Sequence, residues 1–360
     1  MEQSFINGKV NLLIENYKAL NEVKGSWQMG LIQHSCALAF TLKNKRISPR
    51  LVEERIELIK KNTGLFSNFR GYNIFYIATL LSFESNPESS FKMILDIYKE
   101  LKSEKFWGDT YLPLTASIVY ENREKMDYLT CISKMKIIYD YMRKKHPFIT
   151  SSDDYCNIAL IAIHSKNLDE DLEYIEKCYE FLNENGFYKG NDLQALSQIL
   201  LFSDDRTMLK CKKTIELKKA FKENDCKMNY YGYPIIGAIS LLDYREDEII
   251  EEIKNVSNKL KEEKGFGNWS LGKSNRVMIS SAIVASIYAD LIRNENNVGS
   301  ITNNIFLNIV VAIQIACVMA ATRSSYSIFF IKLIRFIEVG YIKFNNTIYM
   351  FKKNIVLHFN

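Results

Sequence analysis

The sequence predicts an all-α fold of about seven stacked helical hairpins, each of ~40 residues. Three observations support this prediction. Only 5 Pro and 15 Gly occur in 360 residues, which favours long helices over a turn-rich β fold. One segment pattern recurs about every forty residues. Between the recurrences, the apolar residues have the spacing of helices.

The recurring segment has a charged helix end, an aromatic residue, a short polar loop and then an apolar helix. TGLFSNFRGYN, residues 63–73, is a clear example. The aligned aromatic residues are 40, 42, 39 and 79 residues apart, the last interval being two periods. They are Phe66, Phe106, Phe148, Phe187 and Phe266. Met228 replaces the missing member, and Trp27 lies 39 residues before the first. We expect these residues to anchor one hairpin against the next.

The segments between these loops predict two antiparallel helices in each unit. Residues 126–145 place apolar residues at intervals of three along one stripe, and residues 246–264 combine such a stripe with a charged face. We expect an apolar helix after each aromatic loop and a charged, amphipathic helix leading into the next loop. The stacked hairpins then form either an open α-solenoid or a closed αα toroid.

The loop of residues 63–73 contains residues that favour turns. Gly64 suits a positive φ after the preceding helix, and Ser67 or Asn68 is suited to accept hydrogen bonds from free N–H groups. We expect Phe66 and Phe69 to pack between neighbouring hairpins. Arg70 has no such structural explanation.

NTGLFSNFRG, together with LIENYKAL and LIQHSCALAF, resembles a group of bacterial proteins, chiefly from Firmicutes. This group is the domain of unknown function numbered four thousand and three. The resemblance extends from about residue 8 to about residue 322 and implies a cytoplasmic helical protein; it transfers no catalytic residue. VVAIQIACVMAA is similar to the Ala-rich helix with which family members end. We therefore expect a helical domain over residues 1–322 and an atypical apolar, basic tail over residues 323–360.

The charges and cysteines exclude several classes of protein. Residues 323–360 hold six basic residues and one acid, whereas the other residues hold 41 of each sign. The body therefore has no basic stripe for nucleic acid. The seven Cys form no CxxC pair, and the four His lie far apart. We expect no metal, no cofactor and reduced thiols in the cytoplasm, and no secretory signal follows Met1.

Polar and aromatic residues of the recurring loops are the candidates for binding, since equivalent loops line one edge of a hairpin array. The residues expected to contact a ligand or partner are Asn68, Arg70, Trp107, Asp109, Asp154, Asp192, Tyr230 and Trp269. In a closed toroid the carboxylates would ring one cavity, as in sugar enzymes of that fold. Asp is also a good N-cap before an apolar helix, and for these three Asp we favour capping.

GNWSLGKS, residues 267–274, matches the phosphate-loop pattern G-x-x-x-x-G-K-[ST]. Such a loop needs a buried strand before it and a helix after it. A charged amphipathic helix precedes it here. We therefore reject nucleotide hydrolysis.

The sequence favours a non-enzymatic module that binds a protein or peptide. One alternative is an αα-toroid enzyme acting on a glycan, lipid or small molecule in a central cavity. A second is a membrane-associated regulator acting through residues 305–344, because residues 305–321 are uncharged and an apolar, basic segment follows. No catalytic residue is assigned.

Overall fold

The computed structural model of the protein describes residues 2–25, 31–71, 73–203, 206–242 and 244–295. Over these residues the chain forms fourteen α-helices and no strand, which confirms the all-α prediction. The helices are α1 (Glu2–Glu22), α2 (Leu31–Leu42), α3 (Pro49–Asn62), α4 (Asn73–Leu81), α5 (Pro87–Ser103), α6 (Tyr111–Glu121), α7 (Tyr128–Lys145), α8 (Tyr155–His164), α9 (Leu168–Glu184), α10 (Asn191–Leu200), α11 (Leu209–Glu223), α12 (Tyr233–Ser240), α13 (Glu246–Lys261) and α14 (Lys273–Glu295).

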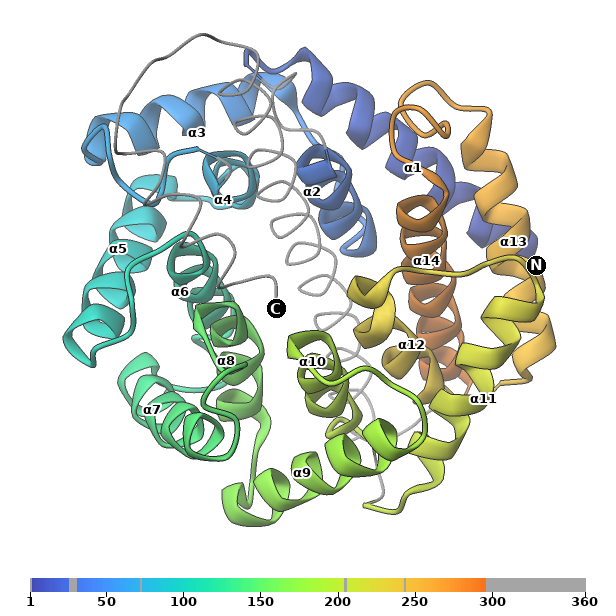
Figure 1. Cartoon of the computed structure of the whole chain (residues 1–360). Coiled ribbons are helices and arrows are strands. Elements are labelled where there is room, and N and C mark those ends of the chain that lie inside the picture. Colours follow the sequence, from blue (N-terminus) through green and yellow to red (C-terminus); the bar gives the residue numbers. More distant parts are fainter. Residues whose placement is uncertain (1, 26–30, 72, 204–205, 243, 296–360) are drawn as a thin grey trace, which may run out of the picture. The chain divides into compact units, whose positions relative to one another are not determined.

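Helices of two kinds alternate along the chain. The even-numbered helices are mostly apolar, and every residue of α4 and of α12 is buried. The odd-numbered helices bury one stripe; in α13 this stripe includes Ile249, Ile253 and Leu260, and the opposite face is charged. A helix that is apolar all round has to be enclosed by neighbours, whereas an amphipathic helix covers a surface. The even-numbered helices accordingly form an inner layer, and the odd-numbered helices lie outside it (Figure 1).

The helix pairs follow one another in a closed circuit. Each outer helix packs against the inner helix that follows it, from α1 with α2 to α13 with α14, and each inner helix contacts the next. The last pair then meets the first, because α14 contacts α1 and α2, and α13 contacts α1 (Figure 1). Within residues 2–295, the first and last pairs therefore cover each other's apolar faces.

Aromatic rings fill the junction between the last pair and the first. Tyr17 of α1 stacks on His34 of α2, with ring centroids 4.2 Å apart. Phe266, in the loop before α14, meets both rings edge-on at 4.9 and 5.0 Å. Such offset and edge-on contacts stabilise aromatic pairs.

Three outer helices, α5, α9 and α11, end in the same hydrogen-bonded turn. The second residue after each of them has a positive φ: Lys105 at 67°, Gly186 at 85° and Asp225 at 57°. The next N–H then bonds back across the turn, as from Phe106 N to Leu101 O at 3.1 Å. In this Schellman turn, the residue that follows the one with positive φ points back toward the helix. Phe106 and its counterpart after α9, Phe187, are therefore buried.

The prediction that Phe66 and Phe148 are buried anchors is wrong, since their side chains are 100% and 98% exposed. The outer helices before them lack the Schellman turn. Thr63, the residue directly after α3, has an extended backbone conformation. Pro147, the second residue after α7, has no N–H to donate. After α3, Phe69 is the buried aromatic residue instead.

The turn chemistry expected for residues 63–73 is partly correct. Ser67 Oγ accepts a hydrogen bond from Phe69 N at 3.3 Å, as expected. The prediction of a left-handed Gly64 is wrong, because the glycine with positive φ in this loop is Gly71, at 65°. The loop makes its sharp reversal just before α4 rather than just after α3.

No helix among the described residues combines the length and the apolar character needed to cross a bilayer. The expected domain boundary after residue 322, the tail of residues 323–360 and the segment of residues 305–344 lie outside the described residues.

Candidate functional site: the loop edge

The loops that connect each outer helix to its inner partner lie together at one edge of the circuit. We call this surface the loop edge; its described loops are residues 63–71, 104–110, 146–154, 185–190, 224–232 and 262–272. Side chains at the starts of inner helices join successive loops. Asn73 Nδ2 donates to Thr110 O at 2.7 Å, and Asn191 Nδ2 donates to Asp153 Oδ2 at 2.8 Å.

Each of these six loops exposes an aromatic side chain. These residues are spaced 41, 41, 40, 42 and 39 positions apart. They are Phe66, Trp107, Phe148, Tyr188, Tyr230 and Trp269. Seven of the eleven large exposed apolar side chains of the described residues lie on this edge, Leu65 included. A single exposed apolar residue is ordinary, but here one recurs in each of six equivalent loops, which makes this edge the candidate binding surface.

Two of the exposed rings directly follow a buried ring in the sequence. Phe106 is turned inward by the Schellman turn and meets Tyr155 edge-on at 4.9 Å. Trp107 then points outward, while its backbone N–H donates to Tyr155 Oη at 3.0 Å. Phe187 and Tyr188 repeat the arrangement after α9, with Phe187 buried and Tyr188 exposed. Burial of the first ring thus fixes the outward direction of the second.

The side chain of Arg70 contacts the backbone of its own hairpin. Its Nη2 atom donates to Lys60 O and to Thr63 O, each at 2.7 Å. These carbonyls belong to the last turn of α3 and to the residue after it. The guanidinium therefore satisfies carbonyl groups at a helix end, an explanation that the sequence did not supply.

The candidate carboxylates contact backbone groups or lie near helix starts. Asp109 Oδ1 accepts a hydrogen bond from Tyr111 N at 2.8 Å. The pKa of Asp109 is raised, mainly by burial, although hydrogen bonds such as that from Ser152 oppose this effect. Asp154 is buried, and its Oδ2 accepts a hydrogen bond from Ser151 N at 2.9 Å. Asp192 lies in the first turn of α10. The capping prediction is partly correct. Asp154 holds the N-cap position of α8, but its side chain makes no capping hydrogen bond. Thr110 and Gly190 hold the N-cap positions of α6 and α10, although Asp109 accepts a hydrogen bond from the first residue of α6.

The other candidates lie at different depths on the loop edge. Asn68 Nδ2 donates to Tyr98 Oη at 3.2 Å, which ties its loop to α5. The ring of Tyr230 meets that of Tyr188 edge-on at 5.1 Å. Trp107 and Trp269 are exposed. The structure thus brings Tyr230 together with Tyr188, a residue that the sequence analysis did not single out.

The phosphate-loop pattern belongs to the loop edge and lacks the surroundings of a phosphate site. Helix α13, not a strand, precedes it. Lys273 forms an ion pair with Asp225 of the neighbouring loop. Ser274 Oγ accepts a hydrogen bond from Asn229 N at 2.7 Å. The two side chains that would hold phosphate and metal therefore join the start of α14 to the neighbouring loop.

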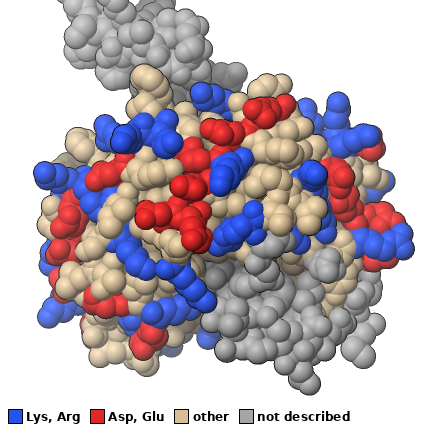
Figure 2. All heavy atoms as spheres, turned by 90° about the horizontal axis from the view of Figure 1, so that it is seen from below, with Lys and Arg blue, Asp and Glu red and all other residues tan. Residues whose placement is uncertain are grey.

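Basic residues gather where the outer helices enter the loop edge. Their last turns carry nine exposed basic residues: Lys60, Lys61, Lys102, Arg143, Lys144, Lys145, Lys222, Lys259 and Lys261. The first turns of α5, α9 and α13, at the opposite edge, carry acids instead. The helix dipole favours both placements. Over the face in Figure 2, by contrast, both signs of charge are interspersed.

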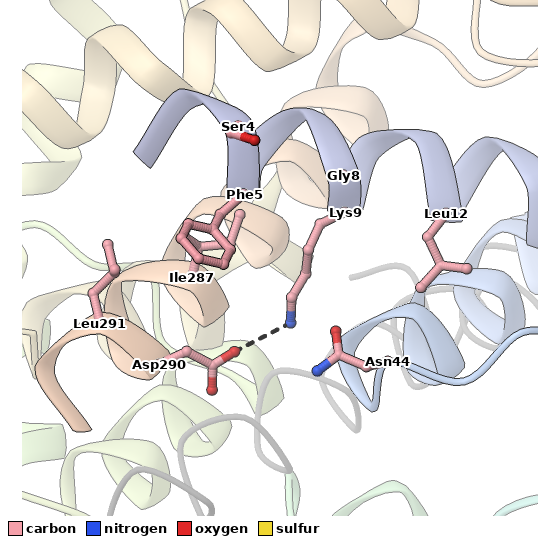
Figure 3. A pocket seen from close by; sticks show the side chains of 9 residues that line it. All are labelled: Ser4, Phe5, Gly8, Lys9, Leu12, Asn44, Ile287, Asp290 and Leu291. Carbon is pink, nitrogen blue, oxygen red and sulfur yellow. Dashed lines mark hydrogen bonds and ion pairs between the residues drawn. The ribbon is translucent and has the colours of Figure 1, made fainter. Parts of the chain in front are cut away.

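A cavity of about 440 Å³ lies between α1 and α14, near the ends of these helices that are remote from the loop edge (Figure 3). Lys9 Nζ contacts Asp290 Oδ2 at 3.3 Å and Leu42 O at 3.4 Å. Apart from Lys9 and Asp290, the described residues that line the cavity are mainly apolar and include Phe5 and Leu12. None of the eight residues expected to bind a ligand is among the lining residues.

The sequence profile of the family described as "Protein of unknown function (DUF4003)" matches residues 16–316. The chain belongs to this family. The "Uncharacterized protein YeaA" of Bacillus subtilis (strain 168) is 26% identical over 229 residues, which cover 62% of this chain and 67% of the relative. No solved structure matches the chain. The resemblance found in the sequence is thereby confirmed.

The region matched by the DUF4003 profile includes every described loop of the loop edge. No three His, Cys, Asp or Glu side chains of the described residues are placed to share a metal ion. In this DUF4003 chain, three exposed rings of the loop edge were not predicted to be exposed: Phe66, Phe148 and Tyr188. Their spacing from Trp107, close to the hairpin period, was the available signal.

Proposed function

We propose that this chain is a non-enzymatic interaction module whose loop edge binds a partner. The recurring exposure of one aromatic ring in each loop carries the proposal. Trp and Tyr contribute most to binding energy when a partner covers them. The loop edge is the proposed binding surface for a macromolecular partner, such as the protein or peptide expected from the sequence.

An enzyme acting in a central cavity has less support from the described residues. Catalytic acids and bases need to reach a substrate, whereas Arg70, Asp109 and Asp154 form hydrogen bonds with backbone groups of nearby residues in their own hairpins. In the cavity of Figure 3 the charged groups Lys9 and Asp290 contact each other.

A cytoplasmic location is part of the proposal. The six cysteines of the described residues are buried free thiols. Cytoplasmic proteins keep their thiols reduced, whereas exported proteins commonly form disulfides.

Site-specific photocrosslinking in cells tests the loop edge as a binding surface. Benzoyl-phenylalanine replaces Phe66 or Phe148, two exposed rings of the loop edge, and replaces Ile137 or Leu209 as controls. Both control residues are exposed apolar residues on the outer helices. We expect protein or lipid adducts from the loop-edge positions and few from the controls. Equal adducts from both sets, or none from the loop edge, would refute the proposal.

A further inference from the structure

We propose that the partner of the loop edge is an anionic lipid surface, onto which the circuit docks with its aromatic loops. This inference rests on the proposed function, because it takes the loop edge as the binding surface. It concerns a part of the chain other than residues 305–344, the segment for which the sequence suggested membrane contact.

The placement of the aromatic side chains suits a broad, flat partner. They occupy six loops that all follow the C-terminal ends of outer helices, and contacts between neighbouring loops hold the set together at one edge. A bilayer surface can reach loops all around the circuit at once. A single bound peptide is narrow and contacts a few of them.

The aromatic side chains are also dispersed. Tyr188 and Tyr230 touch, whereas Phe66, Trp107 and Phe148 belong to three different loops. The residues that dominate protein–protein binding usually cluster near the centre of an interface, in fully desolvated pockets. Separate aromatic residues along one edge are instead typical of the contact between a protein and the bilayer interface, where Trp and Tyr are enriched.

The charge of the loop edge complements anionic lipid. The nine basic residues of the last turns are all exposed. Lys105, Lys189, Lys227 and Lys264 add exposed basic groups in the loops themselves. The exposed acids of the last turns and loops are fewer: Glu22, Glu104, Glu184, Glu223, Asp225 and Glu262. Basic groups close to anionic lipid headgroups strengthen binding, and salt weakens this effect.

Tryptophan fluorescence of the full chain reports on this edge. The chain has 3 Trp. Trp107 and Trp269 lie on the loop edge. Trp27 lies outside the described residues and falls between α1 and α2 in the sequence. We expect vesicles containing half phosphatidylglycerol to shift the emission to shorter wavelength. Bromine-labelled acyl chains should quench it. Pure phosphatidylcholine vesicles and high salt should give a much smaller response.

Matched variants assign the response to the loop edge. Phe66→Ser with Phe148→Ser removes two exposed rings and keeps every Trp. Lys144→Glu with Lys145→Glu reverses two charges at the end of α7. The control, Lys92→Glu with Lys212→Glu, makes the same change in net charge near the starts of α5 and α11. We expect each loop-edge pair to weaken vesicle binding at least tenfold and the control to change it less than twofold.

Each outcome decides one proposal. Vesicle binding that the loop-edge variants leave unchanged overturns the inference and assigns membrane contact to another segment, such as residues 305–344. Absence of vesicle binding, with protein adducts at Phe66 and Phe148 in the crosslinking experiment, overturns the inference but keeps the loop edge as a protein-binding surface. Absence of both overturns the proposed function as well.

Discussion

His34 and Gly265 are joined by a hydrogen bond across the point where the chain closes on itself. The imidazole Nε2 lies 2.8 Å from the carbonyl oxygen of Gly265, although 231 residues separate the two in the sequence. His34 belongs to the first helix pair, and Gly265 to the loop of the last. This hydrogen bond and the nearby ring of Tyr17 leave no room for a side chain at Gly265.

Replacing Gly265 with Ala should destabilise the protein. Gly265 has a φ of 95°, and a Cβ at this position would lie 2.3 Å from the Tyr17 ring. Backbone strain and overpacking of this kind cost about 1–3 kcal/mol. Thermal unfolding followed by circular dichroism measures the effect. Gly64→Ala is the control, since Gly64 lacks both constraints, and equal melting temperatures for the two variants would contradict the prediction.

The Schellman turns predict opposite effects for two substitutions at equivalent positions. Lys105 and Gly186 are each the second residue after an outer helix, and both have a positive φ. Lys105→Gly should stabilise the chain and Gly186→Ala should destabilise it, each by about 1 kcal/mol, because a Cβ disfavours this conformation. Chemical denaturation measures both free energies of unfolding. The same sign of change for both variants would exclude this explanation.

Substitution of Arg70 should lower stability. The guanidinium donates to two backbone carbonyls near the end of α3, and losing charged hydrogen-bond donors there should cost about 1–3 kcal/mol. A melting temperature of Arg70→Ala equal to that of the wild type would show that these bonds contribute little and would renew the case for Arg70 as a ligand-binding residue. Arg70→Lys should retain part of the stability.

His164 should make the protein less stable in mild acid. Burial is the main cause that lowers the pKa of His164 from 6.5 to about 4. Between these values the unfolded chain binds a proton that the folded chain does not, so stability falls as the pH decreases from about 6.5 to 4. His164→Gln should show a smaller loss over this range. Parallel melting-temperature profiles for the two proteins between pH 4 and 7 would contradict the assignment.

The sequence allowed the helices and their order to be predicted, because local patterns determine both. An apolar run such as that of α4, or an amphipathic stripe such as that of α13, can be recognised from a short stretch of sequence. Closure of the circuit depends on contacts like that of His34 with Gly265, whose partners are remote in the chain. No local pattern encodes these contacts, so the sequence alone does not distinguish the open arrangement from the closed one.

The loop edge was predicted as a region but only partly at the level of residues. Trp107, Tyr230 and Trp269 were among the expected contact residues, whereas Phe66 and Phe148 were expected to be buried. The hairpin period gives the position of a loop to within a few residues, but a shift of one residue separates buried Phe106 from exposed Trp107. That direction depends on whether the preceding helix ends in a Schellman turn, and hence on backbone angles that the period does not reveal.

The closed circuit bears on how the protein unfolds. Linear helical arrays fray from their termini, and their units come apart in sequence. In the circuit each pair has a neighbour on both sides, so no pair can detach without breaking two junctions. The described helices are therefore expected to melt cooperatively. Evolution by gain or loss of a single pair would require every remaining junction to change its angle, which favours a constant number of pairs among relatives.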